Sequence, residues 1–219
     1  MILSASMMCG NYDALGEDVV ALDNSGVDMF HIDIMDGNFV PNIAMGRQDI
    51  AAIRRNTTKP LDAHLMVSKP ANYLEILLEE HVDIIYIHPE TDDEVIGTLK
   101  LLKSRNATPG IAVSPQLPFS HFLEVLPYVD YVLLMTVVPG FAGQTFLEYT
   151  HAKIEEFVAG KQQFPYRLML DGAISPEVVH RYSQKGVDGF ILGTSSLFQA
   201  EKNYADVIKE LRQGKNDEN

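Results

Sequence analysis

Two histidines and two aspartates stand on short, strongly apolar segments of the chain, at positions 31, 33, 64 and 171. His31 and Asp33 alternate along one segment, so in a β-strand their side chains share a face. A lone histidine in an apolar strand is more often a hydrogen-bonded core residue than a ligand. Two buried carboxylates, however, repel each other unless a cation or a shared proton compensates. We therefore predict a divalent metal ion bound by His31, Asp33, His64 and Asp171.

Eight short apolar segments recur along the chain without the polar alternation of a half-exposed strand, which predicts strands buried on both faces. Between them, apolar residues spaced three and four apart, as at Leu74, Leu77 and Leu78, indicate amphipathic helices. Leu117-Pro118 and Ser175-Pro176 place a proline near the start of two of these helices. The predicted strands are 2–6, 28–35, 61–67, 82–88, 110–114, 130–136, 166–171 and 188–193.

Eight strands alternating with eight helices in a chain of 219 residues predict an α/β fold, a (β/α)8 TIM barrel. We expect one domain over residues 1–213, followed by a polar, flexible tail over 214–219. All four predicted ligands fall near the carboxyl ends of their strands, the rim that holds the active site in barrels of this kind. Other polar residues end neighbouring strands, namely Ser6, His88, Ser114 and Thr136.

Barrel closure predicts a mechanism for the two aspartates. The second and seventh strands lie three steps apart around an eight-stranded circle, so Asp33 and Asp171 face each other across the interior. One carboxylate could remove a proton beside a carbonyl while the other returns a proton from the opposite face. A metal ion would act as a Lewis acid that stabilises the enediolate between the two steps. Three methionines project to the same rim and could form an apolar wall beside the enediolate. These residues are Met35, Met66 and Met135.

Three glycine-containing loops after neighbouring strands predict a phosphate site. Glycines let backbone N–H groups approach an anion closely, and a helix start favours negative charge, so no lysine is needed. The position after the seventh and eighth strands is the usual phosphate site of such barrels. The loop residues expected to contact substrate are Gly140, Phe141, Ala142, Gly143, Gly172, Ala173, Gly193, Thr194 and Ser195.

Several motifs resemble the ribulose-phosphate 3-epimerase family over essentially the whole chain. The resemblance implies a ribulose-phosphate-binding barrel that inverts carbon 3 of a phosphorylated ketose. It implies the same four metal ligands, with Asp33 as proton acceptor and Asp171 as proton donor, and it adds Ser6 and His64 to the substrate contacts. The motifs are HIDIMDGNFVPN (31–42), LDAHLMV (61–67), LLMTVVPGFAGQTF (133–146), LDGAI (170–174) and LGTSSLF (192–198).

Details within the family favour its D-allulose-6-phosphate 3-epimerase branch. Met8-Cys9, the run 88–91 (HPET), Ala142 and Thr194 match that branch, whereas the ribulose-5-phosphate branch typically differs at these places. We therefore expect D-allulose 6-phosphate and D-fructose 6-phosphate as the substrate pair, with D-ribulose 5-phosphate and D-xylulose 5-phosphate as the alternative. Val138 replaces the usual Asn or Asp, and Ala173 replaces a common second glycine.

Composition restricts the partners. The formal net charge of -13, without a cluster of Lys and Arg, argues against binding nucleic acid. No apolar run approaches the roughly 20 residues that cross a bilayer, and the amino terminus lacks a signal-peptide pattern. Cys9 is the only cysteine, so no intrachain disulfide forms, which agrees with a cytoplasmic location. The family resemblance implies a homo-oligomer. Imidazole and carboxylate ligands suit Zn, Fe, Mn or Co, of which we expect one Zn ion per subunit.

Two other functions compete with epimerisation. An aldolase with a Schiff base needs a desolvated lysine inside the barrel, and no predicted strand supplies one. The segment 33–36 also lacks the lysine that orotidine-type decarboxylases carry there. A non-catalytic sugar-phosphate-binding barrel would not need the complete set of ligands and bases. The remaining histidines are expected at ordinary surface positions, His81, His121, His151 and His180.

Overall fold

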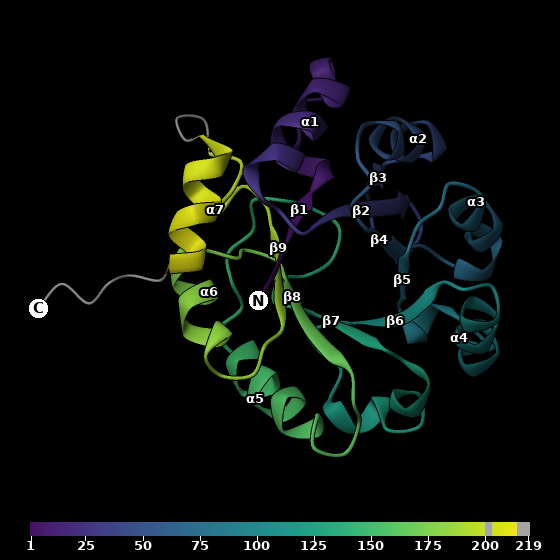
Figure 1. Ribbon diagram of the computed structural model, residues 1–219. Coiled ribbons are helices and arrows are strands. Elements are labelled where there is room, and N and C mark those ends of the chain that lie inside the picture. Colours follow the sequence, from purple (N-terminus) through teal and green to yellow (C-terminus); the bar gives the residue numbers. More distant parts are fainter. Residues whose placement is uncertain (200–202, 214–219) are drawn as a thin grey trace, which may run out of the picture.

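Parallel strands close into a barrel in the computed structural model, which describes residues 1–199 and 203–213 (Figure 1). The sheet closes because β1 pairs in parallel with both β9 and β2. The eight parallel strands are β1 (Ile2–Ser6), β2 (Met29–Asp36), β4 (Leu61–Met66), β5 (Ile84–Ile87), β6 (Thr108–Val113), β7 (Tyr131–Met135), β8 (Arg167–Asp171) and β9 (Gly189–Leu192). The two-residue strand β3 (Ile43–Ala44) pairs antiparallel with β2. The predicted TIM barrel is confirmed, and each predicted strand agrees with its observed bounds to within two residues.

Helices surround the barrel and bury one face each against it (Figure 1). In α4, for example, Leu99 and Leu102 are fully buried, as the spacing predicted, whereas Leu101, which we expected on the same face, is exposed. The α-helices of the described residues are α1 (Leu15–Ser25), α2 (Arg47–Asn56), α3 (Leu74–Glu79), α4 (Val95–Ser104), α5 (Thr150–Gly160), α6 (Pro176–Ser183) and α7 (Tyr204–Gln213). None of these helices is both long and apolar enough to span a membrane.

The connection between β6 and β7 differs from the prediction of eight α-helices. In place of an α-helix after Leu117-Pro118, it contains two short 3-10 helices, Phe119–Phe122 and Leu126–Tyr128. Pro127 has no backbone N–H to continue an α-helix, and its ring would clash with a helical backbone, so only short 3-10 turns form. Phe122 and Leu126 are nevertheless fully buried, so this connection covers its part of the barrel as a helix would.

Large side chains fill the barrel interior where two strands carry glycine. A Cβ atom at Gly110 would lie 2.5 Å from the ring of Tyr86, and one at Gly189 would lie 2.6 Å from the sulfur of Met169. Tyr86 and Met169 are both fully buried, together with other apolar side chains of the strands. The interior is therefore a packed core, and the polar residues described next lie at its carboxyl end. The predicted tail, 214–219, is outside the described residues.

Candidate active site

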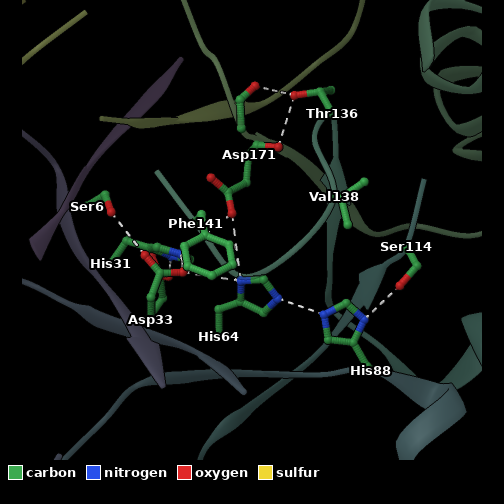
Figure 2. Close-up of polar contacts among 12 residues, drawn as sticks. Ser6, His31, Asp33, His64, His88, Ser114, Thr136, Val138, Phe141 and Asp171 are labelled. Atoms are coloured by element: carbon green, nitrogen blue, oxygen red, sulfur yellow. Dashed lines mark hydrogen bonds and ion pairs between the residues drawn. The ribbon is translucent and has the colours of Figure 1, made fainter. Parts of the chain in front are cut away.

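The four predicted ligands meet in one cluster (Figure 2). His31 and Asp33 come from β2, His64 from β4 and Asp171 from the last residue of β8. One ligand atom from each residue lies within 4.8 Å of the other three. Asp33 Oδ1 is 3.2 Å from His31 Nε2 and 3.4 Å from His64 Nδ1. Asp171 Oδ2 is 3.9 Å from His31 Nε2 and 3.7 Å from His64 Nδ1, so the two carboxylates bracket the two imidazoles.

The cluster has the burial and the donor atoms of a metal site. His31 and His64 are fully buried, Asp33 is 4% exposed, and Asp171 is partly open to the rim. His64 Nδ1 is buried and makes no hydrogen bond within the described part of the chain, yet it faces the two carboxylates. A buried nitrogen lone pair without a donor is costly unless something binds it. Two imidazoles and two carboxylates around that atom fit a divalent cation.

The two carboxylates have different environments. Burial disfavours the ionised form of Asp33, but the charges and hydrogen bonds of His31 and His64 together outweigh burial and hold the pKa of Asp33 well below its usual range. Burial raises the pKa of Asp171 to about 7, and the charges of Asp33 and Asp62 add to this rise against the effect of His31. Burial also disfavours charge on His31, yet Asp62 and Asp33 raise its pKa well above the usual value.

Buried hydrogen bonds hold the cluster in place. Ser6 Oγ donates to Asp33 Oδ2 at 3.0 Å. Asp62 accepts from His31 Nδ1 with one carboxylate oxygen, and its other oxygen accepts from Ser4 Oγ at 3.0 Å. Asp62 and Ser4 are fully buried, and our sequence reasoning did not select them. The alternation of Asp62 with His64 on β4 was the available signal, because both side chains then share the interior face.

The predicted substrate residues, apart from His64, surround one cavity. Asp33, Asp171 and the three methionines line it together with all nine predicted loop residues and Ser6. His64 does not reach the cavity wall, because it is fully buried behind the carboxylates. Cys9 also lines the cavity, and burial, followed by the charge of Asp33, raises the pKa of its thiol. No lysine or arginine of the described residues lines this cavity, so any anion bound here must rely on N–H and hydroxyl donors.

The loops beside the cavity depend on unusual backbone geometry. Gly172 has a φ of +107°, and a Cβ there would lie 2.4 Å from Val137 Cγ2. Thr136 Oγ1 fixes this turn by donating to the carbonyl of Asp171 at 2.9 Å and to that of Gly172 (Figure 2). Ala173 has a φ of +52°, in the left-handed region that glycine adopts more easily. The Ala at this position therefore pays a conformational cost that the common glycine avoids.

Val138 is tolerated because the loop uses its backbone rather than its side chain. Its carbonyl accepts a hydrogen bond from Gln144 Nε2 at 2.6 Å, while the side chain is 57% exposed. The same Gln144 nitrogen donates to the carbonyl of Phe141 at 2.8 Å, and Asn42 Nδ2 donates to the carbonyl of Gly140 at 2.8 Å. These side chains close the loop over the cavity without an Asn or Asp at position 138.

Residues 2–198 match the family model described as "Ribulose-phosphate 3 epimerase family". The chain belongs to the ribulose-phosphate 3-epimerase family. It is 36% identical to the chloroplastic ribulose-5-phosphate-3-epimerase of Arabidopsis thaliana over 98% of this chain and 77% of that protein. It is 35% identical to the ribulose-phosphate 3-epimerase of Aquifex aeolicus, over 91% and 90% of the two chains, and 32% identical to that of Bacillus subtilis, over 97% and 99%.

Solved structures with little sequence similarity share the fold. A structure of KGPDC from Streptococcus mutans superposes with a TM-score of 0.76 at 12% identity, over 97% of this chain and 95% of that one. Thiamine phosphate pyrophosphorylase from Pyrococcus furiosus gives a TM-score of 0.66 at 16% identity, over 97% and 94%. At these identities the likeness extends to the barrel alone.

Family membership makes the chain an isomerase, an epimerase of phosphorylated sugars. The predicted family is therefore confirmed, but the predicted branch is not: the relatives are named for ribulose phosphate and do not support an allulose-6-phosphate enzyme. The match does not identify the metal or the role of each side chain, and those assignments stay predictions.

Two of the four remaining histidines depart from the predicted surface positions. His81 and His121 are exposed, as expected. His151 and His180 are half-buried. His151 lies 3.2 Å from Glu148 and hydrogen-bonds the hydroxyl of Tyr182, because α5 and α6 pack side by side on the barrel. None of the four belongs to the active-site cluster.

Proposed function

We propose that this chain is a metal-dependent ketose-phosphate 3-epimerase that interconverts D-ribulose 5-phosphate and D-xylulose 5-phosphate. The observation that carries the proposal is the joint placement of two imidazoles and two carboxylates at the open rim of the barrel. The names of the relatives favour the pentulose pair over the hexulose pair. His31, Asp33, His64 and Asp171 would hold one divalent ion, with Zn preferred among Zn, Fe, Mn and Co.

Asp33 and Asp171 would carry out the proton transfers at carbon 3. Strands β2 and β8 are separated by β1 and β9 around the barrel, so the two carboxylates approach the cavity from different sides. Asp33 would remove the proton from one face, and Asp171 would return a proton to the opposite face. When bound, the divalent ion would supply positive charge that stabilises the oxyanion character developing on the ketone oxygen. Two opposed carboxylates are the minimum that inversion requires, since a single base would return the proton to the same face.

The rest of the cavity would position the substrate and exclude water. Gly140, Gly143, Gly172 and Gly193 line the cavity, where backbone N–H groups could bind a phosphate without a cationic side chain. Met35, Met66 and Met135 are nearly fully buried and also line the cavity. Their side chains would keep water from the reacting carbon, and low polarity strengthens electrostatic effects there.

D-Allulose 6-phosphate, with D-fructose 6-phosphate, is a second candidate substrate pair. Met8-Cys9, the HPET run at 88–91 and Ala142 are its specific support, since these residues match that branch in sequence. Cys9 and Ala142 both line the cavity, so they are placed where they could contact an extra hydroxymethylene group.

A direct comparison of the two ketoses tests the proposal. Purified protein, stripped of metal and loaded with one defined ion, is assayed with both substrates by kcat/KM and by exchange of the carbon 3 hydrogen in heavy water. We expect exchange and inversion with both ketoses, and the higher kcat/KM with D-ribulose 5-phosphate. A higher value with D-allulose 6-phosphate would replace the pentulose proposal by the hexulose one. Binding of either ketose without exchange would rule out epimerisation through these carboxylates.

A further inference from the structure

A second buried chain of side chains lies behind His64 and takes no part in the proposed proton transfers (Figure 2). His64 Nε2 lies 2.8 Å from His88 Nε2, and both rings are fully buried. On the far side of His88, its Nδ1 lies 3.2 Å from Ser114 Oγ and 3.3 Å from Glu90 Oε1. Ser114 Oγ in turn donates to Glu90 Oε1. This chain of hydrogen-bonded side chains therefore runs from His64 through His88 to the carboxylate of Glu90.

The positions of the protons along this chain follow from its geometry. If His64 Nδ1 offers its lone pair to a cation, its proton must be on Nε2. His64 Nε2 then donates to His88 Nε2, which must be unprotonated. The single proton of a neutral His88 is consequently on Nδ1, where Glu90 Oε1 and Ser114 Oγ are the acceptors. Each nitrogen in the chain has one role, and no donor faces another donor.

Local sequence builds this arrangement directly after β5. Pro89 begins a 3-10 turn, Pro89–Thr91, that folds the chain back toward the ring of His88. Thr91 closes the turn by donating to the carbonyl of His88 from its backbone N at 2.9 Å and from its Oγ1 at 2.9 Å. Glu90 is thereby held beside His88, although it comes from a connection rather than from a strand.

We propose that Glu90, acting through His88, fixes the tautomer and the ring orientation of His64 for metal binding. His88 and Glu90 are positioning residues in this scheme, and the inference depends on the metal site of the proposed function. His31 has the equivalent support without an intermediate, because Asp62 accepts directly from its Nδ1. Both imidazoles of the cluster are thus oriented by a carboxylate, His31 directly by the buried Asp62 and His64 through His88 by Glu90, whose side chain is 22% exposed. Outer partners of this kind typically contribute about 10–100-fold to metal affinity.

Metal affinity in a set of variants tests the relay independently of turnover. His88→Phe retains an aromatic ring and removes the acceptor, and Glu90→Gln retains the shape and removes the charge. His151→Phe and Glu148→Gln are matched controls, because they change a histidine and a glutamate that contact each other on the outside of the barrel. Zn affinity is measured by competition with a chelator. The visible absorption spectrum of the Co-substituted protein reports the coordination of the metal, and ¹⁵N NMR of protein stripped of metal reports the tautomer of His64.

We expect His88→Phe to weaken Zn binding by about 10–100-fold, and Glu90→Gln by about tenfold. In metal-free His88→Phe the proton of His64 should move to Nδ1, toward Asp33 and Asp171, and the Co spectrum should change. Adding Glu90→Gln to His88→Phe should weaken binding no further, because Glu90 acts through the ring that is missing. The two control variants should bind Zn as the unmodified chain does.

Three outcomes would overturn the relay while leaving the metal site in place. One is unchanged Zn affinity, tautomer and Co spectrum in a folded His88→Phe protein. Another is additivity of the two substitutions, which would mean that Glu90 acts on the metal directly. A Glu90→Gln protein with unaltered affinity would also contradict the scheme, and this variant keeps the test decisive if His88→Phe does not fold. Absence of Zn binding by the unmodified chain would overturn the metal site and the relay together, whereas Zn binding without epimerisation would overturn the proposed function alone.

Discussion

Replacing Gly172 by alanine should destabilise the turn that directly follows Asp171 and lines the cavity. Gly172 has a φ of +107°, which an L-residue rarely adopts, and its new Cβ would lie 2.4 Å from Val137 Cγ2 and 3.0 Å from the backbone N of Val137. The backbone N cannot move without displacing β7, whose last residue, Met135, lies two positions earlier. The substitution therefore combines a conformational cost with a steric one.

The magnitude follows from these two terms. A residue held in a sparsely populated backbone region costs about 1–3 kcal/mol, and forcing an extra carbon into a packed site costs about 1–3 kcal/mol. Alanine regains about 0.4–1 kcal/mol because it restricts the unfolded chain more than glycine does. We therefore expect Gly172→Ala to lower the free energy of unfolding by about 1–6 kcal/mol, from the sum of these terms. Urea denaturation followed by circular dichroism measures it.

Two other glycines separate the contributions. Gly143 has a φ of +76° but open space around its Cβ position, so Gly143→Ala should cost only about 1 kcal/mol, from backbone strain. Gly97 is exposed within α4 and has no close neighbour, so Gly97→Ala should stabilise the protein by about 1 kcal/mol. If Gly172→Ala were no more destabilising than Gly143→Ala, the close contact with Val137 would not constrain the loop, and the reasoning would be wrong.

Three further predictions concern the metal and the two carboxylates. Asp33→Asn and Asp171→Asn should each lower kcat for epimerisation by about 10²–10⁴-fold under saturating metal. NMR in heavy water should show that each variant exchanges the carbon 3 hydrogen of a different epimer. Equal exchange with both epimers would contradict two opposed bases. Removal of metal by a chelator should abolish turnover and lower the melting temperature, with about 2.7 kcal/mol of stability returning at a metal concentration of about 100 times Kd; calorimetry that showed no shift would argue against a bound ion. Metal affinity should rise with pH across neutrality, because Asp171, with a pKa of about 7, and His31, with a raised pKa, must lose protons before they bind; a flat calorimetric profile would refute this coupling.

The sequence was sufficient to predict the barrel and the four clustered side chains. Each strand is a short apolar run because a parallel sheet covered by helices buries both of its faces. His31, Asp33 and His64 stand out because a polar residue in such a run is costly unless it has a partner. Once the strands are aligned in a closed barrel, their carboxyl ends share one rim, so the meeting of β2, β4 and β8 residues follows from strand order alone.

The support behind the cluster could not be predicted in the same way. Asp62 lies on a predicted strand and shares a face with His64, so the signal was present but ambiguous between the interior and the rim. Glu90 belongs to a connection whose path depends on the turn after Pro89, and local spacing does not place its carboxylate beside His88. The missing helix between β6 and β7 has a similar cause, because prolines near a helix start and prolines within 3-10 turns look alike in sequence.

The comparison with distant barrels indicates which part of the molecule determines the reaction. Proteins named as a pyrophosphorylase and as an isomerase of phosphoribosyl anthranilate share this fold at 16% and 15% identity, so the barrel does not choose the chemistry. In this chain we propose that the interior face of β2 does so, because His31 and Asp33 would supply a metal ligand and a base there, and no lysine lies on any strand of the described residues. A Schiff base on a barrel strand would need such a lysine, whereas the proposed proton transfer between opposed carboxylates requires only the residues that the rim already brings together.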